Sequence, residues 1–213
     1  MMRMFSLSIV ATLAFAAVPA GFTSIHPDKE LKGWHISQEN HHGKTQSWVV
    51  EDGGVLSGTQ DKPGHGGILL TDKRYKNFEV SMDIKPDWGC DGGLFLRSNE
   101  KGQAYQVMLD YLEKGDVGGI YGEGLKGVKG TRSNDYQKVW KKDHWNHIRA
   151  RIEGDVPHIQ VWINGTQVTD WTDTENHLAD GATDGMIAVQ VHLGNRWVEG
   201  GKHRFRNIAV KEL

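Results

Sequence analysis

The chain has 213 residues, 25 basic and 27 acidic side chains, and a formal net charge of −2. This length suits one all-β domain, and the balanced charge gives no electrostatic basis for binding nucleic acid. Glycine (27 residues) and tryptophan (8 residues) are frequent, and long helical runs of Leu, Ala, Glu and Lys are missing, so we expect short strands joined by glycine turns.

Residues 1–20 have the pattern of a secretory signal peptide. Arg3 precedes an apolar run from Phe5 to Val18, and small residues follow it. This run is shorter than the about 20 residues that span a bilayer, so a cleaved signal peptide is favoured and a permanent membrane anchor is the weaker alternative. We therefore predict cleavage after Ala20, a secreted, periplasmic protein without a membrane contact, a polar lead-in over residues 21–30 and a single domain over 31–213.

Cys90 is the only cysteine, so an internal disulfide is excluded. It lies beside Asp91 with no histidine pair nearby in the sequence, and we interpret it as a small packed residue in a turn rather than a nucleophile.

The first half of the domain shows short strand patterns. The first ordered segment is expected at 33–36, followed by a hairpin of strands 48–51 and 55–58 and by a strand at 68–71. Residues 78–84 alternate strictly, which predicts that Phe78, Val80, Met82 and Ile84 point into a core.

Three central strands carry polar side chains on one parity. The strands are expected within 92–98, 105–110 and 119–123. The opposite parity is apolar, so one face of this sheet packs on the core and the other faces water or a polar ligand. The polar row consists of Phe95, Arg97, Gln106, Met108, Asp110, Tyr121 and Glu123, and the apolar row of Leu94, Leu96, Tyr105, Val107, Leu109 and Ile120.

The second half adds strands at 147–152, 158–163, 165–169, 185–193 and 203–211, after a long Gly- and Lys-rich connection over 124–142. Asn164-Gly165 predicts a two-residue hairpin turn. In the strand 185–193, Val189, Val191 and Leu193 form an apolar face, and Ala188, Gln190 and His192 form the other face. About a dozen strands without a helix predict a jelly-roll sandwich of two antiparallel sheets.

A set of motifs follows in a fixed order along the chain: Gly33-Trp34, Trp48 with Asp52-Gly53, 78–84, 92–97, Asp110, 119–121, Trp145-Asn146, Asn164-Gly165, 189–192 and 205–208. In this order they resemble the 3-keto-disaccharide hydrolase family, over roughly residues 31–213. The resemblance implies a concanavalin A-like jelly roll, a secreted or periplasmic setting and cleavage of glycosides oxidised at carbon 3.

A ketone at carbon 3 acidifies the hydrogen at carbon 2, so the reaction needs a base, an oxyanion stabiliser and an acid. His192 is the expected base, and Arg97 the donor to the developing enolate oxygen. Asp110 or Glu123 could be the acid or orient the sugar. The expected substrate-binding residues are Gln190 and Gln106 for hydroxyls and Tyr121, Trp88 and Trp197 for stacking on sugar rings.

Several of these residues also have simpler structural interpretations. Arg97 could form a cross-strand salt bridge with Asp110 or Glu123, and His192 could be a half-buried strand histidine. We expect Arg206-Asn207 to fix the closing strand rather than to contact substrate.

Two other functions fit the same polar face. It could belong to a lectin-like module that binds carbohydrate without turnover, or Asp110 and Glu123 could be the paired carboxylates of a conventional glycoside hydrolase.

No cofactor is expected. A structural or catalytic divalent metal stays an open alternative, but the eleven histidines show no specific ligand spacing that supports it. His41-His42 and His144-x-x-His147 are weak metal signals. The expected partner is an oligosaccharide, disaccharide or other glycoside, with a sugar 3-dehydrogenase as a functional link that would supply the ketone.

Overall fold

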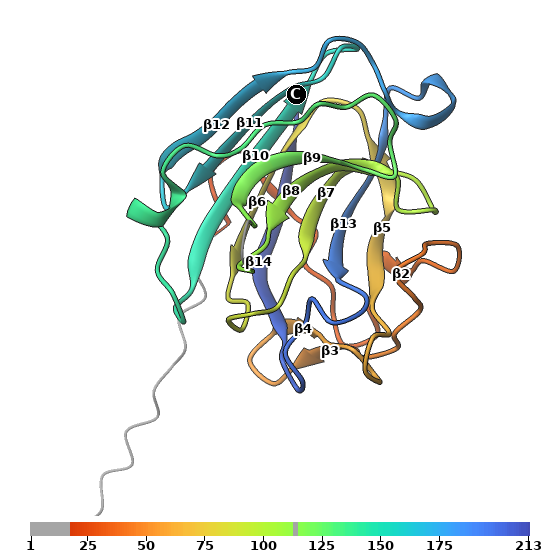
Figure 1. Cartoon of the computed structure of the whole chain (residues 1–213), viewed down its shortest axis with the longest axis vertical. Helices are drawn as coiled ribbons and strands as arrows, with labels where there is room; N and C mark the ends of the chain where they lie inside the picture. Colours follow the sequence, from red (N-terminus) through yellow and green to blue (C-terminus); the bar gives the residue numbers. More distant parts are fainter. Residues whose placement is uncertain (1–17, 113–114) are drawn as a thin grey trace, which may run out of the picture.

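The computed structural model describes residues 18–112 and 115–213, and this part of the chain folds into fourteen strands and two short 3-10 helices (Figure 1). The strands are β1 (Thr23–Ser24), β2 (Trp34–Ile36), β3 (Trp48–Glu51), β4 (Val55–Gly58), β5 (Gly67–Tyr75), β6 (Phe78–Ile84), β7 (Gly93–Ser98), β8 (Ala104–Leu109), β9 (Val117–Glu123), β10 (Asn146–Glu153), β11 (His158–Ile163), β12 (Thr166–Thr172), β13 (Gly185–Val191) and β14 (His203–Glu212). The 3-10 helices are η1 (Tyr136–Lys138) and η2 (Ala179–Gly181).

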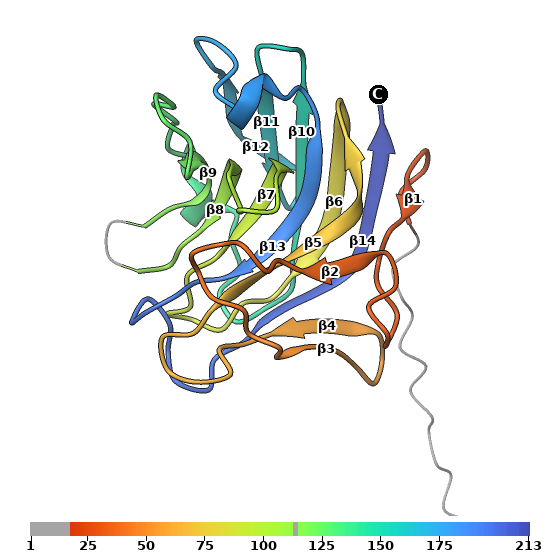
Figure 2. The same cartoon turned by 90° about the vertical axis from the view of Figure 1, so that its right-hand side faces the viewer.

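The strands form two antiparallel sheets that lie face to face (Figures 1 and 2). The larger sheet has eight strands in the order β12-β11-β10-β6-β14-β4-β3, with β1 paired to β14. The smaller has six strands in the order β2-β5-β13-β7-β8-β9. Both orders contain neighbours that are far apart in the sequence, as in a jelly roll. The predicted all-β sandwich of two antiparallel sheets is confirmed.

Alternating side chains fill the space between the sheets. In β6, Phe78, Val80, Met82 and Ile84 are at most 1% exposed and belong to the main core, as their alternation predicts. The smaller sheet contributes the complete apolar row to the same core: Leu94, Leu96, Tyr105, Val107, Leu109 and Ile120. Period-two alternation therefore identified correctly which face of the central strands is buried between the sheets.

The two predicted hairpins are present. β3 pairs with β4, and β11 pairs with β12. Asn164 and Gly165 connect the second pair with φ values of 50° and 85°, the left-handed conformations that a type I′ turn requires. Asn and Gly tolerate these angles better than other residues, which is why this dipeptide ends one strand and begins the next.

Strand β1 lies within the segment expected to be a polar lead-in. Thr23 and Ser24 pair with Val210 and Ala209 of β14, and Trp34 Nε1 donates a hydrogen bond of 2.7 Å to the Ile25 carbonyl. The pairing with β14 attaches the segment to the larger sheet, and the Trp34 bond attaches it to β2 of the smaller sheet. The predicted signal peptide lies outside the described residues apart from 18–20. No helix in the described residues is both long and apolar enough to cross a membrane.

The outer face of the smaller sheet, turned away from the core, is partly apolar and partly polar. Towards one end, Ile68, Leu70, Phe95, Ala104, Met186 and Ala188 form a small second cluster of buried side chains. Beside it lie Gln106 and Met108 of β8 and Tyr121 and Glu123 of β9, which line a pocket. The polar row of the central strands therefore contributes directly to a cavity on this face.

Candidate functional site

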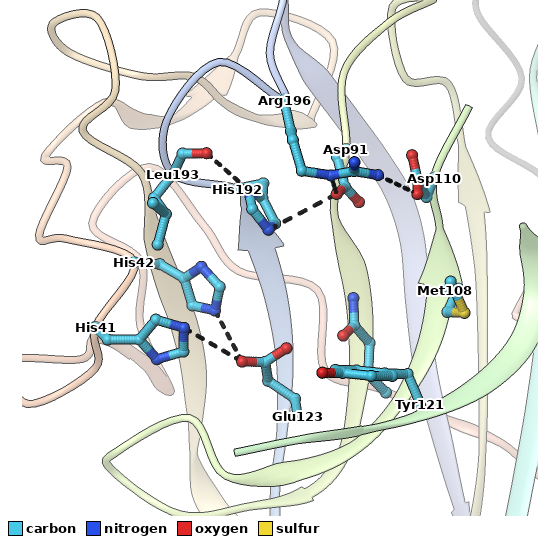
Figure 3. A pocket seen from close by; sticks show the side chains of 11 residues that line it. His41, His42, Asp91, Met108, Asp110, Tyr121, Glu123, His192, Leu193 and Arg196 are labelled. Atoms are coloured by element: carbon cyan, nitrogen blue, oxygen red, sulfur yellow. Dashed lines mark hydrogen bonds and ion pairs between the residues drawn. The ribbon is translucent and has the colours of Figure 1, made fainter. Parts of the chain in front are cut away.

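A pocket of about 400 Å³ opens on the outer face of the smaller sheet (Figure 3). Its volume lies in the range of small-ligand sites. Strands β8 and β9 supply its floor, and the connections β2–β3 and β13–β14 supply its walls. The lining residues are His41, His42, Asp91, Gln106, Met108, Asp110, Tyr121, Glu123, His192, Leu193 and Arg196.

His192 follows the last residue of β13 and lies in the pocket wall with its side chain 22% exposed. Its Nδ1 is 2.7 Å from the Leu193 carbonyl oxygen. A carbonyl oxygen can only accept a hydrogen bond, so Nδ1 carries the proton and Nε2 has a free lone pair. Nε2 lies 3.7 Å from Asp91 Oδ2. In its neutral form His192 can therefore accept a proton at Nε2, beside the Asp91 side chain.

Asp91 precedes β7 and is tied to the opposite wall through its backbone. Its N–H donates to the Arg196 carbonyl at 2.9 Å, and its own carbonyl accepts from His192 N–H at 3.3 Å. Its buried side chain accepts a 2.6 Å hydrogen bond from Arg196 Nε. Burial raises the pKa of Asp91 and outweighs the opposing effects of Arg196 and His192.

Arg196 joins two carboxylates across the pocket. Its Nε bonds Asp91, and its Nη2 bonds Asp110 Oδ2. The other oxygen of Asp110 accepts from the Leu112 backbone N–H at 2.9 Å. Asp110 thus accepts hydrogen bonds from both Arg196 and the Leu112 backbone, and these contacts hold the Arg196 guanidinium in place.

Glu123 ends β9 and faces two consecutive histidines of the β2–β3 connection (Figure 3). Its Oε1 lies 3.4 Å from His41 Nε2 and 3.3 Å from His42 Nε2. Burial lowers the pKa of His42 despite the nearby carboxylate. Burial would raise the pKa of Glu123, but His42, His41 and His192 hold it below its ordinary value. The cluster therefore favours a neutral His42 imidazole beside an ionised Glu123 carboxylate.

Gly43 lets the chain turn directly after these histidines. Its φ is 114°, and a Cβ atom there would lie 2.7 Å from the Gly66 carbonyl oxygen. A side chain at this position would push the connection away from β5, so glycine is required to hold His41 and His42 over the sheet.

Gln106 and Gln190 form a buried amide pair under the pocket. Gln106 Nε2 donates to the Gly92 carbonyl at 3.1 Å and to Gln190 Oε1 at 3.2 Å. Gln190 Nε2 in turn contacts the His42 ring, 2.9 Å from Nε2 and 3.3 Å from Nδ1. Gln190 is fully buried and does not line the pocket, so it holds the His42 ring rather than binding a sugar hydroxyl. Gln106 does line the pocket, as expected for a residue that binds hydroxyls.

Arg97 lies outside the pocket, in contrast to the expected role as oxyanion stabiliser. Strand β13 pairs with β7 with a register shift at this point, where Met186 lies opposite Ser98 and Ala188 opposite Phe95. Arg97 has a φ of 55° and is 1% exposed. The bulge breaks the two-residue alternation, so the Arg97 side chain leaves the polar row.

The partners of Arg97 lie in two turns at the ends of strands. Its guanidinium donates to the Lys76 carbonyl at 2.6 Å, to Asn77 Oδ1 at 3.0 Å and to the Gly154 carbonyl at 3.0 Å. These are structural contacts between the sheets. The expected salt bridge of Arg97 with Asp110 or Glu123 is also absent from the described contacts, and Arg196 supplies the guanidinium of the pocket instead.

Trp88 and Trp197, two of the three expected stacking residues, do not line the pocket. Trp88 packs on Tyr111 at a centroid distance of 5.0 Å, with Lys142 Nζ 4.2 Å from its ring centre. Trp197 is buried, and its Nε1 donates to the Gly201 carbonyl. Tyr121 alone of the three lies on the pocket, with 53% of its surface exposed.

Six pocket residues were not identified as site residues by sequence reasoning: the apolar Met108 and Leu193, and four with ionisable side chains, Asp91, Arg196, His41 and His42. Asp91 was considered only as the neighbour of Cys90, and Arg196 lies in an irregular connection without periodicity. His41 and His42 were noted only as a weak metal signal, because Glu123, the carboxylate that they face, is distant in the sequence. The pocket thus brings together His192, a guanidinium, three carboxyl groups and the pair of His41 and His42, and these groups are suited to moving protons and binding hydroxyls.

Solved structures with this arrangement of sheets include proteins linked to carbohydrates. A candidate glycosyl hydrolase from Parabacteroides distasonis superposes with a TM-score of 0.59 at 24% identity, covering 84% of this chain and 99% of the other. The carbohydrate-binding module CBM66 from Bacillus subtilis superposes with a TM-score of 0.56 at 16% identity, covering 84% and 96%. At these identities the similarity establishes the fold.

Sequence comparison identifies the family. A protein of Bacteroides thetaiotaomicron named 3-keto-disaccharide hydrolase is 24% identical, covering 91% of this chain and 79% of the relative. The profile of the family described as 3-keto-alpha-glucoside-1,2-lyase-like domain matches residues 21–211. The resemblance inferred from the ordered motifs is confirmed, and the chain belongs to the 3-keto-alpha-glucoside-1,2-lyase-like domain family.

Proposed function

We propose that the pocket cleaves glycosides whose sugar carries a ketone at carbon 3, by elimination across carbons 1 and 2 followed by addition of water. The observation that carries this proposal is His192, whose Nε2 is free to accept a proton beside Asp91 and the Arg196 guanidinium. The family description and the name of the Bacteroides thetaiotaomicron relative support the same substrate class.

The ketone makes the carbon 2 hydrogen acidic, because the electron pair left behind is delocalised onto the carbonyl oxygen. His192 Nε2 takes this proton, and the resulting enolate expels the oxygen on carbon 1 as the C1–O bond breaks. The aglycone oxygen takes up a proton. Water then adds its hydroxyl to carbon 1, and carbon 2 regains a proton, so the net reaction is hydrolysis without a change of oxidation state.

Three other groups have roles in this scheme. Arg196 places positive charge and N–H donors where negative charge develops. Asp91, whose pKa burial raises, is the group best placed to exchange protons with His192. Tyr121, half exposed at the pocket, offers a ring face and a hydroxyl to the sugar.

The substrate class also motivates proposals about setting and partner. A 3-keto-glycoside must be made by oxidation of a sugar hydroxyl, so we propose that a sugar 3-dehydrogenase supplies it. The signal-like pattern of residues 1–20 supports export to the periplasm, with cleavage after Ala20.

The test compares matched glucosides that carry a chromogenic aglycone, one oxidised at carbon 3 and one not. We expect aglycone release from the keto substrate alone, with carbon 2 deuterium in the product when the reaction runs in D₂O. Release from the unoxidised glucoside at an equal rate would indicate a conventional glycosidase. Saturable sugar binding without release from either substrate would indicate a binding module, and both results contradict the proposal.

A further inference from the structure

Three polar side chains meet on the outer face of the larger sheet, where strands β6 and β10 lie side by side (Figure 1). Every second residue of β6 points into the core, so Ser81 and Asp83 point outward. In the antiparallel register, His147 lies opposite Asp83 and Arg149 lies opposite Ser81. His147 is therefore directly beside Asp83 and diagonal to Ser81, within reach of both.

The three side chains form a chain of hydrogen bonds. His147 Nδ1 lies 3.1 Å from Asp83 Oδ1, and His147 Nε2 lies 3.3 Å from Ser81 Oγ. An ionised carboxylate can only accept a hydrogen bond, so Nδ1 carries the imidazole proton and Nε2 accepts from the Ser81 hydroxyl. Serine, histidine and aspartate linked in this order are the arrangement that activates a hydroxyl as a nucleophile.

Two further donors favour the ionised form of Asp83. Its Oδ2 accepts from Arg206 Nε at 3.1 Å and from Asn207 Nδ2 at 2.8 Å. Burial would raise the pKa of Asp83, but the hydrogen bonds from His147, Asn207 and Arg206 hold it below its ordinary value. The carboxylate can therefore stabilise a His147 ring that has taken up the Ser81 proton.

The backbone holds these groups in place from two sides. The pairing of β14 with β6 shifts register between Arg206 and Ala209, and Asn207 at this bulge has a φ of 55°. The bulge lets the consecutive residues Arg206 and Asn207 bond the same carboxylate. The His147 N–H donates to Asn164 Oδ1 at 2.9 Å, and the His147 carbonyl accepts from the Asn164 N–H at 2.8 Å. The β11–β12 turn therefore fixes the histidine.

A pocket of about 280 Å³ opens beside Ser81. Its lining residues are Pro19, Phe22, Ser81, His147, Arg149, Trp162 and Gly165. Phe22 and Trp162 supply apolar surface, and the Arg149 guanidinium lies 4.0 Å from the centre of the Trp162 ring. Only 1% of the Ser81 surface is exposed, so a reacting group has to enter this pocket to reach the hydroxyl. The small volume, the apolar walls and the positive charge suit a small acyl group.

From this geometry we propose that Ser81, His147 and Asp83 form a second hydrolytic site, which cleaves esters of small acyl groups such as acetate. Ser81 Oγ attacks the ester carbonyl carbon while its proton passes to His147 Nε2, and Arg149 places positive charge near the developing oxyanion. The bond between the acyl carbon and the alcohol oxygen then breaks, and the alcohol leaves with the proton from His147. Water attacks the acyl-serine in the same way, which releases the carboxylic acid and restores Ser81.

The test uses a fluorophosphonate probe on the predicted mature chain, which begins at Gly21 and so retains Phe22 but not Pro19. The probe reacts with an activated serine: the bond from oxygen to phosphorus forms, the bond from phosphorus to fluorine breaks, and fluoride leaves. We expect one label per chain, located at Ser81 by mass spectrometry of peptides. Ser81→Ala should lose the label, and His147→Gln should slow labelling by about 10² to 10⁴.

Hydrolysis of p-nitrophenyl acetate is the second measurement, and the wild type should be faster than Ser81→Ala by a similar factor. Ser57→Ala is the matched control. Ser57 follows the buried Leu56 in β4 of the same sheet, so it also points outward, but its Oγ donates to Glu51 Oε1 at 2.9 Å rather than to a histidine. This variant should be labelled like the wild type. Circular dichroism verifies that each variant is folded.

Three outcomes would overturn the second site. They are folded wild-type protein without a label at Ser81, His147→Gln protein that is labelled at the wild-type rate, and labels spread over several serines, Ser57 included. The proposal does not rest on cleavage of keto-glycosides, because β6 and β10 belong to the larger sheet and the pocket of His192 lies on the smaller one. The two proposals can therefore fail separately.

Discussion

Arg196 Nε lies 2.6 Å from Asp91 Oδ2, and its Nη2 simultaneously bonds Asp110. Asp91 precedes β7 and Asp110 follows β8, so a single guanidinium closes the open end of this hairpin. These two contacts join the smaller sheet to the β13–β14 connection, and they place the positive charge of Arg196 beside Asp91, the neighbour of His192.

Replacing Arg196 by Lys should lower kcat/KM for the keto-glucoside about a hundredfold. A lysine ammonium cannot bond two carboxylates in the fixed planar geometry of a guanidinium, and loss of one electrostatic donor costs about 10² to 10³ in rate. Steady-state kinetics measures the effect. Arg74→Lys is the control, because Arg74 makes a comparable pair with Asp184 on the surface; equal losses in both variants would contradict a role in the pocket.

His192→Gln should abolish proton removal from carbon 2 while the fold is retained. Glutamine keeps polarity and similar size but cannot accept the proton, and general-base catalysis contributes about 10² to 10⁴ in rate. The readout is exchange of the carbon 2 proton with D₂O, followed by NMR. Exchange at the wild-type rate would refute the assignment of His192 as base.

Tyr121→Ala should raise KM roughly threefold to tenfold with a smaller change in kcat, because stacking contributes about 0.5–1.5 kcal/mol to binding. Trp88→Ala is the informative comparison. Trp88 is similarly exposed but packs on Tyr111 away from the pocket. The KM of the Trp88→Ala variant should therefore match that of the wild type. A raised KM in Trp88→Ala alone would mean that the substrate binds elsewhere on this face.

Arg97→Met should destabilise the fold by about 3 kcal/mol and leave the activity per folded molecule unchanged. The variant leaves the acceptors of Lys76, Asn77 and Gly154 without their donor, and unpaired buried polar groups are costly. Denaturant titration gives the free energy of unfolding, and Arg74→Met should change it by at most about 0.5 kcal/mol. A large loss of kcat in folded Arg97→Met protein would restore the catalytic role expected from the sequence.

His203 should make the fold sensitive to acid. The ring is completely buried, and burial lowers its pKa to about 4 from 6.5. His203 in the unfolded chain therefore becomes protonated below about pH 6.5, whereas His203 in the folded chain becomes protonated only below about pH 4. Between these pH values the proton stabilises the unfolded chain, so the free energy of unfolding falls as the pH falls.

The size of this effect follows from the two pKa values. Between pH 7.5 and 4.5 the loss due to His203 should be about 2 to 3 kcal/mol, at roughly 1.4 kcal/mol per pKa unit. Denaturant titrations at both pH values, on wild type and His203→Gln, isolate the contribution. Identical pH dependence of the two proteins would exclude His203 as the responsible group.

Local alternation was sufficient to predict most of the strands and which face of the central strands is buried between the sheets. Phe78, Val80, Met82 and Ile84 followed it without exception, and Asn164-Gly165 identified its hairpin, because these features depend on residues close in the sequence. The polar row likewise predicted that Gln106, Tyr121 and Glu123 share a face. The motif order also identified the family.

The sequence alone determined the sandwich, its core and the floor of the pocket on β8 and β9, because side-chain alternation and turn chemistry depend on neighbouring residues. Only the tertiary structure decided which charges meet there. The bulge at Arg97 depends on how β7 pairs with β13, and it removed the predicted guanidinium from the pocket. Arg196 with Asp91, and Glu123 with His41 and His42, meet because connections of irregular backbone fold over the sheet. Such contacts follow no period, so they become visible only when distant segments are packed together.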